Sequence, residues 1–255
     1  MRFTRRQTLG LAGSALAGTL IGSEPARAAA PGEIKAVAFD AFPVFDPRPI
    51  FALVETIAPQ RGKELGNLWR TRQFEYTWLR TISNQYENFW KVTQDALLYA
   101  ARALKIELTP QQIETIMGAY LDLKAWPEAR EALGALREAG LRLGFVSNFT
   151  SNMLQSAIKN AELDGYFEQV LSTDAVRRFK PDASAYRMAM EGFGLEREEI
   201  LFVPFAGWDA AGAKWFGYET FWVNRLGTPP EELGVVADAT GANLSDLVRF
   251  LGAKG

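Results

Sequence analysis

The sequence has no histidine and no cysteine among its 255 residues. These absences exclude Ser-His-Asp and Cys-His nucleophilic catalysis, metal sites built on imidazole or thiolate ligands, and disulfide bonds. Any catalysis must therefore use carboxylates, amines, guanidinium groups, hydroxyls or backbone N–H groups.

The chain also lacks a strong excess of charge. It carries 28 Lys and Arg against 30 Asp and Glu, a formal net charge of -2 at pH 7. Nucleic-acid binding needs clustered basic residues, so nothing here indicates a nucleic-acid partner. With 48% hydrophobic residues, the chain can bury a full core as one large domain or two smaller ones, and it is not expected to be disordered.

The first 28 residues are typical of an export signal. A twin-arginine segment at 4–9 precedes a weakly apolar stretch at 9–22, and Ala26-Arg27-Ala28 is a small-x-small cleavage site. The apolar stretch is shorter than the roughly 20 residues that cross a bilayer. We predict a twin-arginine signal peptide over 1–28 that engages the twin-arginine export machinery, is cleaved near Ala28 and delivers the protein to the periplasm.

Short, continuous apolar runs predict strands buried on both faces of a sheet. They occur at residues 34–39, 141–147, 169–172, 200–205 and 220–223. Helical patterns accompany the later strands, at residues 127–139, 152–161, 183–192, 210–216 and 244–251. This alternation predicts an α/β fold with a doubly wound parallel sheet.

A helical insertion separates the first two predicted strands. Apolar residues recur at helical spacing over 65–82, 89–104 and 110–123, and Thr109-Pro110 supplies an N-cap and a first-turn proline. Ligands of doubly wound sheets bind outside the carboxyl ends of the strands. We predict a Rossmann-like core over 29–47 and 127–255, with a helical cap over 48–126 that covers this crevice.

Polar side chains stand at the ends of four predicted strands. Asp40 follows the first strand, Ser147 and Asn148 end the second, Lys180 follows the third, and Asp209 follows the fourth. Each has a plainer interpretation, since Asp, Ser and Asn often cap a helix or loop. The ordered set is less easily accidental, and the four strand ends are expected to bring these groups together.

This ordered set resembles the haloacid dehalogenase superfamily, and the cap narrows the resemblance to its type II L-2-haloacid dehalogenases. The cap segment 68–80, Leu-Trp-Arg-Thr-Arg-Gln-Phe-Glu-Tyr-Thr-Trp-Leu-Arg, is similar to theirs. Further similar segments lie at 88–89, 95–97, 179–182 and 208–213. The resemblance extends over nearly the whole mature chain, from about residue 34 to residue 250.

The resemblance implies metal-independent hydrolysis of short 2-haloalkanoic acids to 2-hydroxy acids, with no cofactor. In the family the Asp after the first strand, here Asp40, attacks C2 and expels halide, and water then hydrolyses the resulting ester. Lys180 would hold the Asp40 carboxylate, while Asp209 would orient Lys180 and help to activate water. A carboxylate nucleophile needs no imidazole, which agrees with the absence of histidine.

The resemblance also implies contacts to the substrate and the leaving halide. Arg70 matches a cap residue that binds both, Ser147 and the N–H groups around Asn148 suit the substrate carboxylate, and Tyr186 matches a tyrosine near the active site. Relatives are often dimers, so a homodimer is a further expectation.

Aromatic residues are expected to line the pocket. Phe42, Phe89 and Trp208 match pocket positions of the family, although any one of them could be an ordinary core aromatic. An apolar wall would desolvate Asp40 and the leaving halide.

The main alternative is a phosphatase-like member of the same superfamily. Such enzymes hold Mg²⁺ between the first-strand Asp and a second acidic residue after the fourth strand, and they carry a general acid two residues beyond the nucleophile. Here that position is Phe42, and Asp209 is the one acidic residue near the fourth strand. A metal-free site is therefore favoured.

The chain departs from the family pattern beside the nucleophile and after the fourth strand. Residues 42–46 are Phe-Pro-Val-Phe-Asp instead of Tyr-Gly-Thr-Leu-Phe-Asp, and residues 204–209 are Pro-Phe-Ala-Gly-Trp-Asp instead of Ser-Ser-Asn-Ala-Trp-Asp. Phe149 stands where glycine is usual, which predicts a smaller pocket. Because polar groups near the hydrolytic water are lost, a non-catalytic, vestigial binding protein of the same fold stays open as a third hypothesis.

Overall fold

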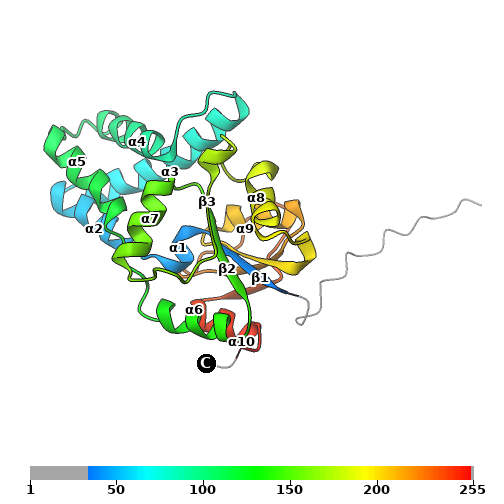
Figure 1. The fold of residues 1–255 in the computed structure, drawn as a ribbon. Coiled ribbons are helices and arrows are strands. Elements are labelled where there is room, and N and C mark those ends of the chain that lie inside the picture. The colour runs from blue at the N-terminus through cyan, green and yellow to red at the C-terminus, as the bar shows by residue number, and fades with distance from the viewer. Residues whose placement is uncertain (1–33, 254–255) are drawn as a thin grey trace, which may run out of the picture.

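The computed structural model describes residues 34–253 of the chain (Figure 1). The predicted export signal over 1–28 lies outside the described residues. Within the described part of the chain, no helix combines the length and the apolar character needed to cross a membrane.

A parallel sheet forms the centre of the molecule. Its order is β3-β2-β1-β4-β5-β6, and each neighbouring pair is parallel. The strands are β1 (Ala36–Phe39), β2 (Arg142–Ser147), β3 (Gln169–Ser172), β4 (Ile200–Val203), β5 (Glu219–Val223) and β6 (Ala239–Gly241). The strand order diverges on either side of β1, so the ligand crevice of this doubly wound sheet lies at the carboxyl end of β1.

The five strands expected from the sequence are confirmed, and β6 is an addition. It has three residues, Ala-Thr-Gly, and none of them is buried. Such a segment carries no apolar run and therefore gave no strand signal.

Helices cover both faces of the sheet. They are α6 (Ala129–Glu138), α7 (Ser151–Asn160), α8 (Ala183–Phe193), α9 (Gly207–Phe216) and α10 (Leu244–Phe250). Alternate residues of β1 point to opposite faces: Val37 and Phe39 join the larger core cluster, whereas Ala36 and Ala38 pack in the cluster that contains Tyr186 and Phe202. The strand is buried on both sides, which explains its uninterrupted apolar sequence.

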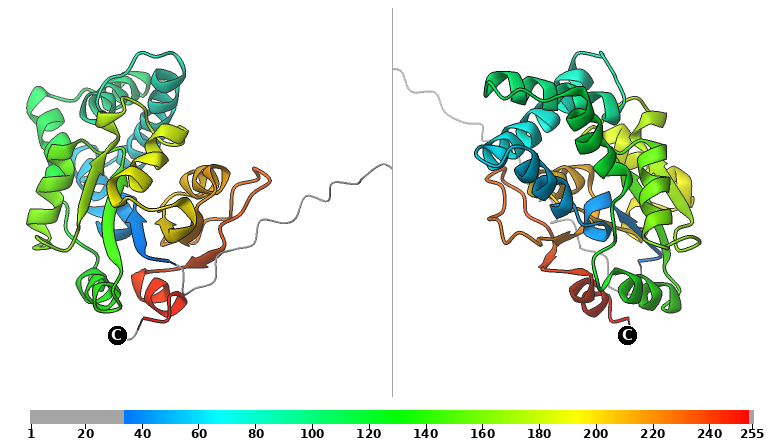
Figure 2. Two further views of the ribbon diagram at one scale, coloured as in Figure 1. Left: turned by 45° about the vertical axis from the view of Figure 1, so that its right-hand side comes forward. Right: turned by 90° about the vertical axis from the view of Figure 1, so that its left-hand side faces the viewer.

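The helical insertion contains four helices: α2 (Arg48–Ile57), α3 (Gly62–Ile82), α4 (Phe89–Ala103) and α5 (Pro110–Gly118). Figures 1 and 2 show them gathered at one end of the molecule, away from α6 and α10. The N-caps of α4 and α5 are Asn88 and Thr109, and Thr109 forms a capping box with Gln112. The helix α2 was not predicted from the sequence; it begins without a side-chain cap, and Pro49 lies in its first turn.

The two connections between the sheet and these helices run side by side. The first follows the short helix α1 (Ala41–Val44), and Phe45 pairs with Ala125 of the second in an isolated antiparallel bridge. The amide of Asp46 donates to the carbonyl of Lys124 at 2.9 Å. The helical insertion is thereby attached beside the carboxyl end of β1.

Candidate active site

A buried lysine joins two carboxylates from different strand ends. Lys180 Nζ donates to Asp40 Oδ1 at 2.9 Å and to Asp209 Oδ2 at 2.6 Å. Asp40 follows β1 directly and caps α1, Asp209 lies in the first turn of α9 after β4, and Lys180 precedes α8. Lys180 and Asp209 are almost completely buried, whereas Asp40 is only partly buried. The three sequence-predicted catalytic residues therefore meet, and Asp40 is the one most open to a ligand.

The pKa values of Lys180 and Asp209 follow from burial and from their mutual attraction. Burial alone would lower the pKa of Lys180, but the nearby charges of Asp209 and Asp40 outweigh it and leave the pKa above its usual value. Burial raises the pKa of Asp209 to about 6, although the Lys180 ammonium acts in the opposite direction. Lys180 is therefore a cation at neutral pH, and Asp209 titrates close to neutrality.

Tyr186 supports Asp209 from behind. It is fully buried on α8, and its hydroxyl donates to Asp209 Oδ1 at 2.8 Å. A Cβ at Gly212 would lie 2.4 Å from the Tyr186 hydroxyl oxygen, so only glycine allows α9 to approach this closely. Tyr186 does not line the pocket. The expectation of a substrate contact is corrected: the geometry gives Tyr186 a positioning role, because it occupies the carboxylate oxygen that Lys180 leaves unbonded.

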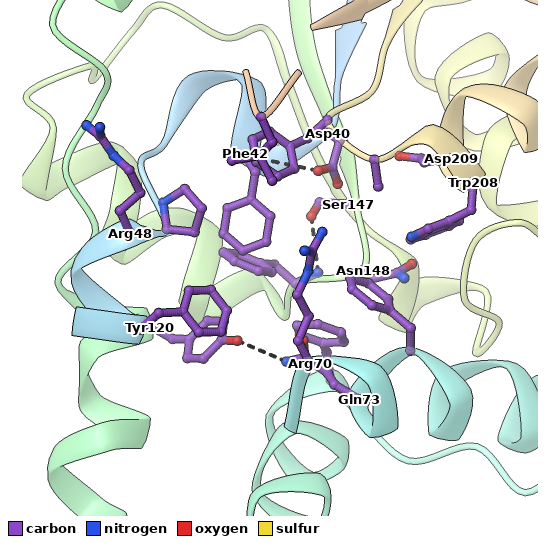
Figure 3. A pocket seen from close by; sticks show the side chains of 18 of the residues that line it. Asp40, Phe42, Arg48, Arg70, Gln73, Tyr120, Ser147, Asn148, Trp208 and Asp209 are labelled. Carbon is purple, nitrogen blue, oxygen red and sulfur yellow. Dashed lines mark hydrogen bonds between the residues drawn. The ribbon is translucent and has the colours of Figure 1, made fainter. Parts of the chain in front are cut away.

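A cavity of about 150 Å³ lies in front of Asp40 (Figure 3). Its wall is largely apolar, and aromatic rings from both the sheet side and the helical insertion contribute to it. The predicted pocket residues Phe42, Phe89 and Trp208 all line it. Phe51, Phe74, Tyr120, Phe149 and Phe205 add further rings. An apolar cavity with one partly exposed carboxylate fits a small, largely apolar ligand.

Arg70 supplies a positive charge to this cavity. It extends from α3 toward the side that holds Ser147 and Asp40 (Figure 3). Desolvation lowers its pKa, but an arginine keeps its charge throughout the physiological range, and Arg70 forms no ion pair with a carboxylate within residues 34–253. Asp40, Asp209 and Lys180 together carry one negative charge. Arg70 is thus the group that can attract an anionic ligand past them.

Trp208 contributes a second unused donor. Its indole Nε1 is buried and has no hydrogen-bond partner among the described residues. Buried N–H groups without partners are rare in folded proteins. Beside Arg70, this donor fits an anion better than an apolar group.

Ser147 and Asn148 place further donors at the end of β2. Both are buried and line the cavity. Asn148 Oδ1 accepts from the Lys180 amide at 2.9 Å, and Ser147 Oγ accepts from the Phe149 amide at 3.2 Å. Within residues 34–253, neither the Ser147 hydroxyl nor the Asn148 amide nitrogen donates a hydrogen bond to another residue. The N-cap of α7 is Thr150, so neither residue has the capping role that was the plainer interpretation.

Gln73 and Tyr120 are among the polar residues of the cavity that the sequence did not reveal, together with Arg48 and Asn67. Gln73 Nε2 donates to Thr93 Oγ1 at 2.7 Å and to the Tyr120 hydroxyl oxygen at 3.1 Å. Burial raises the pKa of Tyr120 to about 12, so it stays a neutral phenol. Gln73 lies three residues after Arg70 on α3, and that helical spacing was the available signal.

The departures from the family pattern create an apolar wall beside Asp40. The ring centroids of Phe42 and Phe149 are 5.2 Å apart, and those of Phe42 and Phe205 are 5.6 Å apart. Besides Lys180, the described residues give Asp40 one donor, the Phe42 amide at 3.3 Å from Oδ2. The sequence predicts a loss of polar groups near the nucleophile, and in the structure three aromatic rings lie there.

The described residues offer no cluster suited to a metal ion. Within residues 34–253, no three Asp, Glu, His or Cys side chains are arranged to bind one. The two carboxylates that could share a cation are instead bridged by the Lys180 ammonium. The donor set therefore does not fit the Mg²⁺ site of the phosphatase-like alternative.

Several known proteins with related sequences and structures are haloacid dehalogenases. Residues 16–217 match the family model described as a haloacid dehalogenase-like hydrolase. An (S)-2-haloacid dehalogenase of Pseudomonas sp. (strain YL) is 39% identical over 218 residues, which cover 85% of this chain and 94% of that protein. A crystal structure of an L-2-haloacid dehalogenase superposes with a TM-score of 0.84 at 44% identity, covering 86% of this chain and 99% of the other.

A further solved relative carries a bound molecule. It is the L-2-haloacid dehalogenase from Xanthobacter autotrophicus with chloropropionic acid covalently bound. It superposes with a TM-score of 0.79 at 33% identity, covering 87% of this chain and 100% of the other.

The Tyr186→Phe variant tests the positioning role of Tyr186. It removes a donor to ionised Asp209, so we expect the pKa of Asp209 to rise above about 6 and the free energy of unfolding to fall by about 1–3 kcal/mol. Carbon-13 NMR titration of the Asp209 carboxyl measures its pKa, and urea unfolding measures the free energy of unfolding. Tyr218→Phe is the matched control, because the Tyr218 hydroxyl donates to the Tyr186 carbonyl and not to Asp209. An unchanged Asp209 titration in Tyr186→Phe would contradict the role.

Proposed function

Because the chain belongs to the haloacid dehalogenase-like hydrolases, and within them to the (S)-2-haloacid dehalogenases, we propose a reaction of that family for it. The proposed reaction is the hydrolysis of short 2-haloalkanoic acids to 2-hydroxy acids. The observation that carries the proposal is the partly exposed Asp40 carboxylate, held by buried Lys180 at the floor of an aromatic cavity that contains Arg70. A carboxylate in such a place is a nucleophile for carbon, and the cavity suits a small acid.

The substrate carboxylate binds where donors are unused. The Ser147 hydroxyl and the Asn148 amide nitrogen lie at the carboxyl end of β2, beside Asp40. Arg70 approaches from the opposite side, on α3, and with the Trp208 indole N–H it is suited to the halogen and the departing halide. We propose that C2 of the substrate lies between the carboxylate site and the halide site, facing Asp40.

In the first step Asp40 attacks C2. A carboxylate oxygen forms a bond to C2 while the carbon–halogen bond breaks, and halide leaves with the bonding electron pair. Lys180 holds Asp40 in a fixed orientation, and the rings of Phe42, Phe149 and Phe205 reduce hydration of the reacting groups. The relative with covalently bound chloropropionic acid supports a covalent intermediate of this kind.

In the second step water attacks the carbonyl carbon of the Asp40 ester. Asp209, with a pKa of about 6, is ionised at neutral pH and can take up a proton as the water adds. The bond between Asp40 Cγ and the ester oxygen then breaks, Asp209 returns the proton to the departing alkoxide, and the 2-hydroxy acid leaves with an oxygen that belonged to Asp40. The Lys180 ammonium supplies the local positive charge, so the cycle needs no metal ion.

Asp40→Asn tests the proposed nucleophile. We expect halide release from L-2-chloropropionate and chloroacetate to fall at least about a thousandfold, since removing a catalytic nucleophile has effects of this size or larger. Halide is measured by ion chromatography in the presence of EDTA, which should leave the rate of the unmodified protein unchanged. Asp122→Asn, at an exposed carboxylate paired with Lys124, is the matched control. The proposal fails if Asp40→Asn retains the full rate, or if halide release requires Mg²⁺.

Phe149→Ala tests the limit on substrate length. Phe149 is buried and packs its ring against Phe42, Phe89 and Tyr120. Shortening it should raise kcat/KM for 2-chlorobutyrate relative to chloroacetate by about tenfold or more, because added methylene groups then find room. Phe250→Ala, which truncates a ring on α10 packed against Phe221, controls for a general loss of packing. An unchanged ratio in a folded Phe149→Ala protein would contradict the assignment.

A further inference from the structure

The turn that follows Asp40 lacks N–H donors within the turn for three of its backbone carbonyls. The helix α1 has four residues, and the Phe45 amide closes it on the Ala41 carbonyl at 2.9 Å. In a longer helix the next carbonyls would accept from residues 46, 47 and 48. Here the Asp46 amide donates to Lys124, Pro47 has no N–H, and the Arg48 amide donates to Asp46 Oδ1. The carbonyls of residues 42–44 therefore depend on donors from elsewhere.

Two residues supply all three donors. Trp126 Nε1 donates to the Phe42 carbonyl at 2.9 Å, and the Trp126 amide donates to the Val44 carbonyl at 3.0 Å. The Arg225 guanidinium donates to the Pro43 carbonyl at 2.7 Å. Trp126 lies in the second connection of the helical insertion, and Arg225 in the loop after β5. Segments far apart in the sequence thus hold one turn, and we call this pair of residues the Trp126–Arg225 clamp.

The clamp is itself held in place. The Arg225 guanidinium carbon lies 4.1 Å from the centroid of the Trp126 ring, and Arg48 covers the same ring at 4.5 Å. Arg225 also pairs with Glu128 at 2.7 Å, and its side chain is only 6% exposed. Burial lowers the pKa of Arg225 while Glu128 opposes that effect, and an arginine stays charged under these conditions. A buried cation with this partner has one well-defined orientation.

Asp40 connects the clamp to the chemistry. It is the N-cap of α1, and its Oδ2 accepts from the Phe42 amide at 3.3 Å. The residue whose amide orients the carboxylate is therefore also a residue whose carbonyl the clamp holds. Because the hydrogen bond to Asp40 is already long, a small movement of α1 would leave Lys180 as its remaining anchor among the described residues.

We propose that Trp126 and Arg225 are positioning residues that fix the orientation of the Asp40 carboxylate by holding the three carbonyls of α1. Neither residue lines the cavity. The inference rests on the proposed function, because the orientation of Asp40 matters for the rate only if Asp40 attacks the substrate. Loss of the clamp therefore changes the alignment of the Asp40 carboxylate and leaves substrate binding unaltered.

Trp126→Phe and Arg225→Met test the clamp by two readouts. Trp126→Phe keeps an aromatic side chain and the backbone donor, but it replaces the indole by a smaller phenyl ring without Nε1–H, so the Phe42 carbonyl loses its partner. We expect amide hydrogen exchange in the peptide spanning 41–46 to accelerate by about tenfold in either variant. We also expect kcat for halide release to fall by about tenfold while KM stays within about twofold. Mass spectrometry without substrate gives the exchange rates, and a peptide from β4 reports on global opening.

Trp215→Phe is the matched control, because Trp215 is 60% exposed on α9. It should leave both readouts unchanged. Unaltered exchange at 41–46 in both clamp variants, equal acceleration in β4, or faster exchange with unchanged kcat would each overturn the inference. If the unmodified protein releases no halide, the proposed function fails, and exchange at 41–46 alone still decides whether the clamp holds the turn.

Discussion

The attraction of one buried ammonium for two carboxylates is the constraint on which the site depends. Removing Lys180 from water is costly, and only close partners compensate for the loss of its hydration. Asp40 and Asp209 meet this requirement from two adjacent strands, at 2.9 and 2.6 Å. Tyr186 takes the remaining oxygen of Asp209, and Gly212 allows the two helices to approach closely enough for this contact. The sheet order, the packing of α9 on α8 and the orientation of the nucleophile are thus parts of one arrangement.

The same site combines a strongly polar floor with an unusually apolar wall. Rings at Phe42, Phe149 and Phe205 surround a carboxylate that has one donor besides Lys180 among the described residues. A dry wall favours the first step, in which a carboxylate attacks carbon and halide departs. The second step needs an ordered water, and here Asp209 is the main polar group left to orient it. The family's hydroxyl and amide groups that are absent at 42–46 and 204–209 would act on the water. Their absence therefore slows ester hydrolysis more than carbon–halogen cleavage, and we expect the second step to be the slower one.

Much of this could be predicted from the sequence because the relevant signals are local. Asp40, Ser147 and Asp209 each stand where an apolar run ends, and parallel strands bring such ends to one edge. The strand β6 was missed because Ala-Thr-Gly has no apolar run, and α2 because it begins without a capping side chain. The family resemblance placed Tyr186 among the substrate contacts, and a match in sequence does not tell whether a side chain enters a cavity or lies behind it. Trp126 and Arg225 were not identified at all: their partners are backbone carbonyls some 80 and 180 positions away in sequence, and no side-chain pattern records such a contact.

The central claim is that the oxygen of the product hydroxyl comes from Asp40 and not directly from water. A single turnover of L-2-chloropropionate in oxygen-18 water, with enzyme in excess over substrate, tests it most directly. Mass spectrometry of the product and of the peptide that contains Asp40 locates the label. The account predicts that the label appears in Asp40 and that the first 2-hydroxypropionate formed is unlabelled. Label in the product with none in Asp40 would show that water attacks C2 directly, and it would contradict the account.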